Sequence, residues 1–328
     1  MNFPSFDLEV GQNGYRWWYL DAMSDDGQHT MTIIVFVGSV FSPYYSWARQ
    51  RSGGNPENFC SFNVALYGPG GRWCMTERDR KSVSRRANSL SIGKSRVELV
   101  DQQLHYHIDE FGCPLPFPIQ GHLKVDIPQT LGKPLALDAP ACRHHWQSLG
   151  AQSRISVNLE KPEWNWSGNA YVDSNWGSAP LEDTFSSWQW SRAHLPDRST
   201  LIHYDTELCN GDSSQQSMLI DASGKLSESN LQPLNHTLPS TNIWRIARQA
   251  HTDPTSPSGA TAAISRLKTL EDTPFYSRSQ FDTTVEGLQA NCIHESLDLT
   301  RFKKRWVRYL LPFRMPRNTA TKLQASSI

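Results

Sequence analysis

The chain has 328 residues with 32 basic and 32 acidic side chains, and it is long enough for two domains with a sizeable core. Its six cysteines form no Cys-x-x-Cys pair, which argues against a zinc site or a disulfide framework. The longest apolar run, residues 31–37, is far too short to span a bilayer, and no secretory signal is visible. We therefore expect a cytoplasmic protein that is soluble or peripheral to a membrane.

Short runs of strand-forming residues follow one another through the first half of the chain, with turn signals such as Gly-Pro-Gly-Gly71 between them. Many of these runs alternate polar and apolar positions, as antiparallel strands with one buried face require. Convincing helices are nearly absent. The expected strands are residues 15–20, 30–37, 59–67, 72–77, 89–92, 95–99, 103–108, 121–127, 154–159 and 168–172.

A second series of strands begins at residue 185, where Trp188-Gln-Trp190 loosely repeats the aromatic pattern of residues 15–19. The expected strands are residues 185–192, 199–207, 217–221, 244–249, 259–267 and 283–294, with polar loops at 223–240 and 253–258. A Gly-Ser-Ala-Pro segment near residues 177–184 is suited to a linker. The pattern predicts an all-β protein with domains at 1–178 and 179–299 and a tail at 300–328.

The segment Gly168–Gly177 combines an acid with a phenol. Tyr171 and Asp173 are two residues apart, so on a strand they share a face. Three tryptophans close by in the sequence are candidates for a dry substrate-binding surface, and they are Trp164, Trp166 and Trp176. A carboxyl group in such surroundings is hard to ionise. The alternative is a strand end at which Asp173 caps a turn.

Long stretches of the chain resemble the bacterial carotenoid 1,2-hydratases, also called hydroxyneurosporene synthases. The most distinctive stretches are residues 14–22 (Gly-Tyr-Arg-Trp-Trp-Tyr-Leu-Asp-Ala), 32–45, 62–68, 75–78, 108–110, 114–116, 168–177 and 311–316. The wider superfamily, which includes hydrolase-like proteins and fungal enzymes of Diels–Alder cyclisation, has two consecutive lipocalin-like antiparallel β domains of barrel or sandwich type. The resemblance implies this fold for the present chain.

The resemblance also implies a reaction, the addition of water across the terminal C1=C2 double bond of an acyclic carotenoid such as lycopene or neurosporene. Protonation at C2 gives a tertiary cation at C1, which water captures to form a tertiary alcohol. The family's implicated set falls on His144, Trp146, Tyr171 and Asp173. An ordinary Asp, with a pKa near ~3.9, must be desolvated to keep its proton for this step. His144 is the candidate for orienting the water.

Other readings of the same scaffold stay open, because one fold hosts several chemistries. An isomerase or cyclase of polyenes would not need Asp173 as an acid, and a non-catalytic carrier would only hold an apolar pigment. No organic cofactor is expected, because the chain has neither a Gly-x-Gly-x-x-Gly motif after a strand nor a P-loop. No metal is expected either, because His105 and His107 lack a third ligand nearby.

The C-terminal tail concentrates positive charge, with eight basic residues and no acid in residues 301–328. Residues 301–311 are predicted to form an amphipathic helix with Phe302, Trp306, Tyr309 and Leu310 on one side. Such a helix binds an anionic membrane interface, here through residues 301–317, or it packs as a terminal helix on its own domain. With a lipid-dissolved substrate, the first alternative places the protein on the cytoplasmic side of the inner photosynthetic membrane. Nucleic acid is not an expected partner.

Overall fold

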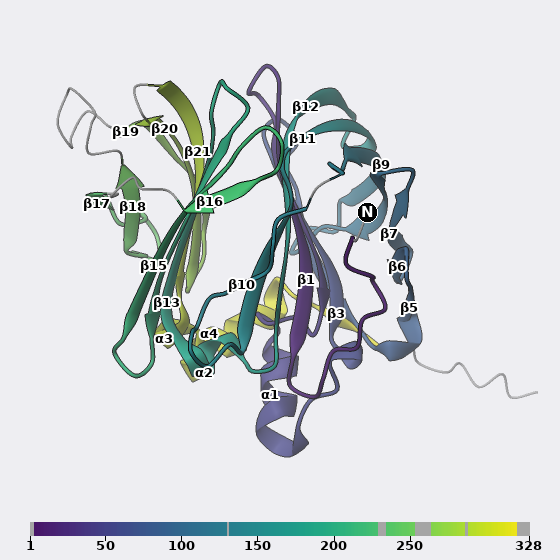
Figure 1. Cartoon of the computed structure of the whole chain (residues 1–328). Helices are drawn as coiled ribbons and strands as arrows, with labels where there is room; N and C mark the ends of the chain where they lie inside the picture. Colours follow the sequence, from purple (N-terminus) through teal and green to yellow (C-terminus); the bar gives the residue numbers. More distant parts are fainter. Residues whose placement is uncertain (1–2, 130, 229–233, 253–263, 286–287, 320–328) are drawn as a thin grey trace, which may run out of the picture.

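Antiparallel strands make up most of the computed structural model, which describes residues 3–129, 131–228, 234–252, 264–285 and 288–319. They form two large curled sheets that face each other, as Figure 1 shows. The all-β fold predicted from the sequence is therefore confirmed.

The first sheet has 13 strands in the order β22-β4-β3-β2-β1-β12-β11-β9-β8-β7-β6-β5, with β10 paired to β11. Its strands are β1 (Tyr15–Ser24), β2 (Thr30–Val37), β3 (Cys60–Tyr67), β4 (Trp73–Arg78), β5 (Val83–Arg86), β6 (Ser89–Ile92), β7 (Ser95–Val100), β8 (Gln103–Phe111), β9 (Pro118–Asp126), β10 (Leu135–Ala136), β11 (His144–Lys161), β12 (Trp164–Gly177) and β22 (Arg317–Asn318). Most neighbours in the sheet are also neighbours in sequence, as short turns require.

The second sheet has seven strands in the order β16-β15-β14-β13-β21-β20-β19. Its strands are β13 (Phe185–His194), β14 (Thr200–Leu208), β15 (Ser213–Ile220), β16 (Leu226–Glu228), β19 (Ile264–Asp272), β20 (Tyr276–Val285) and β21 (Leu288–Asp298). A separate hairpin pairs β17 (Leu234–Leu238) with β18 (Arg248–Thr252). The change from one sheet to the other falls between Gly177 and Phe185.

Alternation along β1 shows how the sheets are held together, because successive side chains on a strand point to opposite faces. Trp18 and Leu20 enter the core enclosed by the first sheet. Trp17 and Tyr19 face the other way and join Trp190 and Leu297 of the second sheet in a shared core. Both faces of the first sheet's central strand are therefore buried, and the core between the sheets is rich in aromatic residues.

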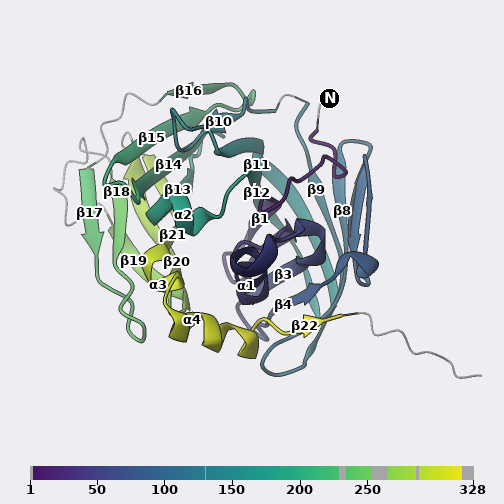
Figure 2. The same ribbon diagram turned by 90° about the horizontal axis from the view of Figure 1, so that it is seen from below.

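The helices are short and lie at the ends of the sheets (Figure 2). They are α1 (Pro43–Ser52), η1 (Pro56–Asn58), η2 (Arg80–Ser82), α2 (Leu181–Thr184), α3 (Leu299–Phe302), α4 (Arg305–Leu310) and η3 (Leu311–Phe313). The sequence analysis missed α1, although it begins with a recognisable signal. Ser42 caps it by accepting a hydrogen bond from the backbone N–H of Tyr45 at 3.0 Å, and Pro43 follows directly.

The C-terminal segment departs from the single helix predicted for residues 301–311. It forms α3, α4 and η3 in succession and then β22, which pairs in parallel with β4 of the first sheet. Figure 2 shows this segment crossing from the second sheet to the first. Within this segment the side chains of Phe302, Val307 and Leu311 are buried, whereas those of Trp306 and Tyr309 are 50% and 58% exposed. Phe302 thus does not share a face with the two exposed aromatics.

Further expectations for the second half of the chain also differ from the structure. The strand predicted at 283–294 is divided between β20 and β21, which pair with each other in antiparallel fashion. The predicted strand at 244–249 begins in a turn, in which the backbone N–H groups of Ile243 and Trp244 donate to Asp272, and strand structure begins only with β18 at Arg248. The polar loop expected at 223–240 contains β16 and β17. Several predicted segments lie partly or wholly outside the described residues, namely 229–233 of the loop at 223–240, the loop at 253–258, 259–263 of one predicted strand, 286–287 of another and 320–328 of the tail. Within the described ranges, no helix is long and apolar enough to cross a bilayer.

Candidate active site

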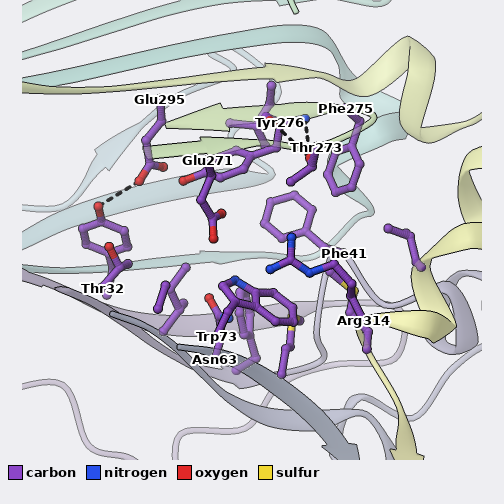
Figure 3. Close-up of a pocket in the computed structure, with 18 of the residues that line it drawn as sticks. Thr32, Phe41, Asn63, Trp73, Glu271, Thr273, Phe275, Tyr276, Glu295 and Arg314 are labelled. Atoms are coloured by element: carbon purple, nitrogen blue, oxygen red, sulfur yellow. Dashed lines mark hydrogen bonds between the residues drawn. The ribbon is translucent and has the colours of Figure 1, made fainter. Parts of the chain in front are cut away.

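A cavity of about 400 Å³ lies between the two sheets, within the size range of small-molecule sites. Both sheets and the C-terminal segment line it, as the close-up in Figure 3 shows. Glu271, Glu295 and Tyr276 of the second sheet face Asn63 and Trp73 of the first across the open space. The apolar part of the lining combines aliphatic and methionine side chains with many aromatic rings, which include Trp17, Phe36, Phe41, Trp73, Trp188, Trp190, Trp244, Phe275 and Phe313.

Asp173 on β12 is the buried acid of this cavity, with only 3% of its surface exposed. Its Oδ2 atom accepts a hydrogen bond from the Tyr171 hydroxyl at 2.7 Å and another from Trp146 Nε1 at 2.9 Å. Its Oδ1 atom is buried without a hydrogen-bond partner in the structure. One oxygen is therefore held in place by two neutral donors, and the other is left to carry a proton.

Burial raises the pKa of Asp173 from its ordinary value of 3.8 to about 7. The hydrogen bonds from Tyr171 and Trp146 oppose this rise by stabilising the carboxylate, and the negative charges of Glu295 and Asp21 add to it. A substantial fraction of Asp173 is therefore protonated at neutral pH, so that the side chain can serve as a general acid.

The strand register places three of the predicted site residues together. Tyr171 and Asp173 share a face of β12, and Trp146 on the adjacent β11 lies opposite Asn175. The Trp146 indole also donates to the Tyr171 hydroxyl at 3.2 Å. Trp146 and Tyr171 thus hold the acid, with their side chains in the core between the sheets.

His144 lies at the start of the same strand but has a different set of partners. Its Nδ1 is 2.9 Å from the Tyr15 hydroxyl and its Nε2 is 2.8 Å from Thr184 Oγ1. A Cβ on Gly177 would stand 2.8 Å from Nδ1, so only glycine leaves room for this ring. Burial lowers the pKa of His144 to about 4, so the ring is neutral at pH 7. It does not line the cavity, and it links β11 to the segment entering the second sheet.

The three tryptophans predicted to surround Asp173 lie elsewhere. The Trp176 ring stacks on the His145 ring, with their centroids 5.3 Å apart. The guanidinium carbon of Arg16 lies 4.5 Å from the centroid of the Trp176 ring. Trp164 donates to the Pro69 carbonyl at 2.9 Å, and Trp166 stacks on His29. None of the three lines the cavity. The reason is the two-residue period of a strand: positions 164, 166 and 176 point away from the face that carries Tyr171 and Asp173.

The aromatic surroundings of Asp173 come instead from residues distant in the sequence. Tyr19 lies directly opposite Asp173 in the β1–β12 ladder, and Trp190 contacts Tyr171 with ring centroids 5.4 Å apart. Trp188 and Tyr204 complete this wall from the second sheet. The alternating aromatics of residues 15–19 and 188–190 were a usable signal for a buried face, but not for the cavity. Among the described residues, no cluster of three or more His, Cys, Asp or Glu side chains is arranged to hold a metal.

Comparison with solved structures connects this architecture to a known fold. A putative AttH protein of Nitrosomonas europaea superposes with a TM-score of 0.59 over 90% of this chain and 98% of its own, at 15% identity. Kievitone hydratase from Nectria haematococca superposes with a TM-score of 0.55 over 91% and 98%, at 8% identity. At such low identity these likenesses show the fold alone, which is the two-sheet lipocalin-like fold.

The sequence gives the closer relationship. Residues 33–324 match the family model of the carotenoid hydratase CrtC. The chain is 45% identical over 315 residues to the acyclic carotenoid 1,2-hydratase of Thiocapsa roseopersicina and 42% identical over 319 residues to that of Rubrivivax gelatinosus, covering 96% of this chain and 76% of each relative. The chain belongs to the carotenoid hydratase family. It is a hydro-lyase of carotenoid biosynthesis.

Proposed function

We propose that the protein hydrates the terminal C1=C2 bond of acyclic carotenoids with Asp173 as the proton donor. The observation that carries the proposal is the unpartnered Oδ1 of Asp173 in an aromatic cavity, beside an Oδ2 held by Tyr171 and Trp146. The proton leaves Oδ1 for C2 as the electron pair of the double bond forms the new C–H bond. The carboxylate that remains is stabilised by the same two donors, which lowers the barrier to proton release.

The cation that develops at C1 lies among aromatic faces. Trp17, Trp188 and Trp190 line the cavity on which Asp173 opens. An aromatic face attracts a desolvated cation by about 2 kcal/mol, and a tertiary carbocation has no water shell to lose in an apolar cavity. Water then captures the cation at C1 to give the tertiary alcohol.

Asp173→Asn tests the donor, because the amide keeps the size of the side chain and has no acidic proton. Purified protein is incubated with detergent-dispersed lycopene in deuterated water, and the products are analysed by mass. We expect one deuterium at C2 of the alcohol with the wild-type protein and at least a 1,000-fold lower rate with the variant. Retention of a tenth of the activity, a loss of only about 1.4 kcal/mol in transition-state stabilisation, would exclude Asp173 as the donor.

We further propose that the cavity opens toward a membrane surface. Leu310 and Phe313 line the cavity and are also 41% and 73% exposed, so the opening lies beside them. The exposed Trp306 ring stacks at 6.0 Å on that of Trp244, which lines the cavity, and the exposed Ile243 and Tyr309 directly precede Trp244 and Leu310 in the chain. We call these exposed apolar side chains the mouth patch, which comprises Ile243, Trp306, Tyr309, Leu310 and Phe313. Lys303, Lys304 and Arg305 next to the patch are exposed cations. Aromatic side chains beside cations are typical of surfaces that enter an anionic lipid interface.

This arrangement suits an extended polyene dissolved in lipid. A cavity of about 400 Å³ is at the lower end of the range for drug-sized ligands. The terminal double bond would therefore enter as far as Asp173 while the rest of the chain extends through the mouth into the membrane.

Co-sedimentation with anionic phospholipid vesicles tests the mouth patch. The double variant Trp306→Ser/Phe313→Ser should bind at least tenfold more weakly, because each exposed apolar side chain contributes on the order of 1.5–3 kcal/mol when buried. Val100→Ser removes an exposed apolar side chain from the β7–β8 turn of the first sheet and serves as the control. Equal binding by the double variant, the control and the wild-type protein would refute the membrane proposal.

A further inference from the structure

A second carboxyl group, that of Glu295 on the second sheet, lies in the same cavity as Asp173. Tyr19 and Asp173 are directly opposed on adjacent antiparallel strands, so their side chains lie on one face about 5 Å apart at Cβ. The Tyr19 hydroxyl donates to Glu295 Oε1 at 2.9 Å, and this hydrogen bond is drawn in Figure 3. Both Tyr19 and Glu295 line the cavity. A hydroxyl and a carboxyl group thus stand in series beside the proton donor.

The charges around Glu295 differ from those around Asp173. Arg278 forms ion pairs with Glu295 and, at 3.3 Å, with Asp21, and Arg192 pairs with Asp21 as well. The side chains of Arg192, Asp21 and Arg278 are each 1% exposed, so their charges must balance inside the protein. Two guanidinium groups require two carboxylates, and Glu295 supplies the second.

Asp173, in contrast, has only neutral donors as hydrogen-bond partners. Two carboxyl groups in one cavity are thereby given opposite tasks: the one without a cation keeps its proton, and the one paired with arginine stays ionised. The remaining titratable groups that interact with Glu295 are Tyr276, Glu271, Tyr67 and Tyr204. Burial raises the pKa of Glu295 above its ordinary value, and the charge of Arg278 opposes that rise.

We propose that Glu295, reached through the Tyr19 hydroxyl, accepts the proton of the attacking water. The proposal rests on Asp173 as the donor of the first proton. As the water oxygen bonds to C1, one of its O–H bonds breaks and the proton passes to Tyr19 Oη, while the Tyr19 proton passes to Glu295. Asp173 ends as a carboxylate and Glu295 as a carboxylic acid. Transfer of one proton from Glu295 to Asp173 then restores the starting state, and the net change is the addition of one water.

The proposed proton acceptor is thus Glu295 and not His144. Both ring nitrogens of His144 form hydrogen bonds outside the cavity, with Tyr15 and Thr184. Glu295 retains 14% exposure of its side chain, and Arg278 holds the carboxylate in place. Water within the cavity therefore reaches the Tyr19–Glu295 pair but not the His144 ring.

Glu295→Ala with added formate tests the role. Formate is ionised at neutral pH, so it replaces a missing base but not a missing acid. We expect hydration to fall at least 100-fold in Glu295→Ala, as for loss of a general base, and formate to restore it at least tenfold with saturation. Asp173→Ala should be inactive with and without formate. Glu110→Gln is the matched control, because Glu110 is also buried and pairs with an arginine, Arg78 at 2.7 Å, but lies outside the cavity. It should keep wild-type turnover.

Turnover within tenfold of wild type in folded Glu295→Ala, or the absence of formate rescue, would overturn the role of Glu295 and leave that of Asp173 intact. Activity in Asp173→Ala would instead overturn the proposed function. If Glu295→Ala does not fold, Tyr19→Phe decides, because it keeps the Arg278–Glu295 pair and removes the linking hydroxyl, to which Arg278 also donates at 2.6 Å. The turnover of the folded variant should fall at least tenfold, and unchanged turnover would refute the relay.

Discussion

The Tyr171 hydroxyl controls how readily Asp173 gives up its proton, and Tyr171→Phe isolates that contribution. The ring contacts with Trp190 and Tyr19 stay, and the 2.7 Å hydrogen bond to Oδ2 is lost. The 3.2 Å hydrogen bond from Trp146 to the hydroxyl is lost as well, but the Trp146 indole still donates to Oδ2 at 2.9 Å. A hydrogen bond to a charged group contributes about 1.5–3 kcal/mol, and one pKa unit corresponds to about 1.4 kcal/mol. Because the lost bond stabilised the carboxylate, the pKa of Asp173 should rise from about 7 by about 1–2 units.

The measurement is the initial rate of lycopene hydration between about pH 5 and pH 9, in detergent, for the wild-type protein and Tyr171→Phe. The pH at which activity is halved on the alkaline side should move upward by the same 1–2 units, since the acid form persists to higher pH. At acidic pH the variant should be roughly tenfold slower, because Asp173 has become a weaker acid. Tyr106→Phe is the control: its hydroxyl is buried without a partner in the core of the first sheet. An unmoved midpoint, or one that moves downward, would refute this reasoning.

Three further predictions concern stability. Because the folded-state pKa of Asp173 is raised from 3.8 to about 7, its contribution to stability is full below pH 3.8 and is lost as the pH rises through 7. The whole change is about 4 kcal/mol, of which about 2.7 kcal/mol falls between pH 5 and pH 9. Urea titrations at pH 5 and pH 9 should show this smaller difference in the wild-type protein, and Asp173→Asn should abolish it. His144→Ala should lower the free energy of unfolding by about 2–4 kcal/mol, because it leaves the buried hydroxyls of Tyr15 and Thr184 without their partner. His145→Ala should change the free energy of unfolding by less than about 1 kcal/mol. Equal losses for the two variants in chemical denaturation would contradict this prediction. Asp21→Ala should cost about 3–5 kcal/mol in the same measurement, because it leaves Arg192 buried without an anion, and a cost below about 1 kcal/mol would show that the network contributes little.

The sequence alone determined the fold class and the position of the acid. Alternating runs and turn signals required an antiparallel all-β chain, because the side-chain period of a strand is encoded residue by residue. The same period placed Tyr171 and Asp173 on one face, as the 2.7 Å hydrogen bond between them shows. Strict use of the two-residue period would also have predicted that Trp164 and Trp176 point away from the face that carries Tyr171 and Asp173. Proximity in sequence was the wrong guide there, because a strand sends its neighbours to opposite faces.

Only the tertiary structure decided what surrounds the acid. Glu295 is 122 residues beyond Asp173 in the sequence and becomes part of the same cavity because the second sheet lies against the first. No local pattern records which faces of two sheets will meet, since that depends on how all their side chains fit together. The tail shows the same limit: composition revealed its charge and aromatic content, but the burial of Phe302 beside the exposure of Trp306 depends on the surface it crosses. Residue types and their spacing fixed the chemistry that the chain can offer, and the packing of the two sheets determined which of those groups act together.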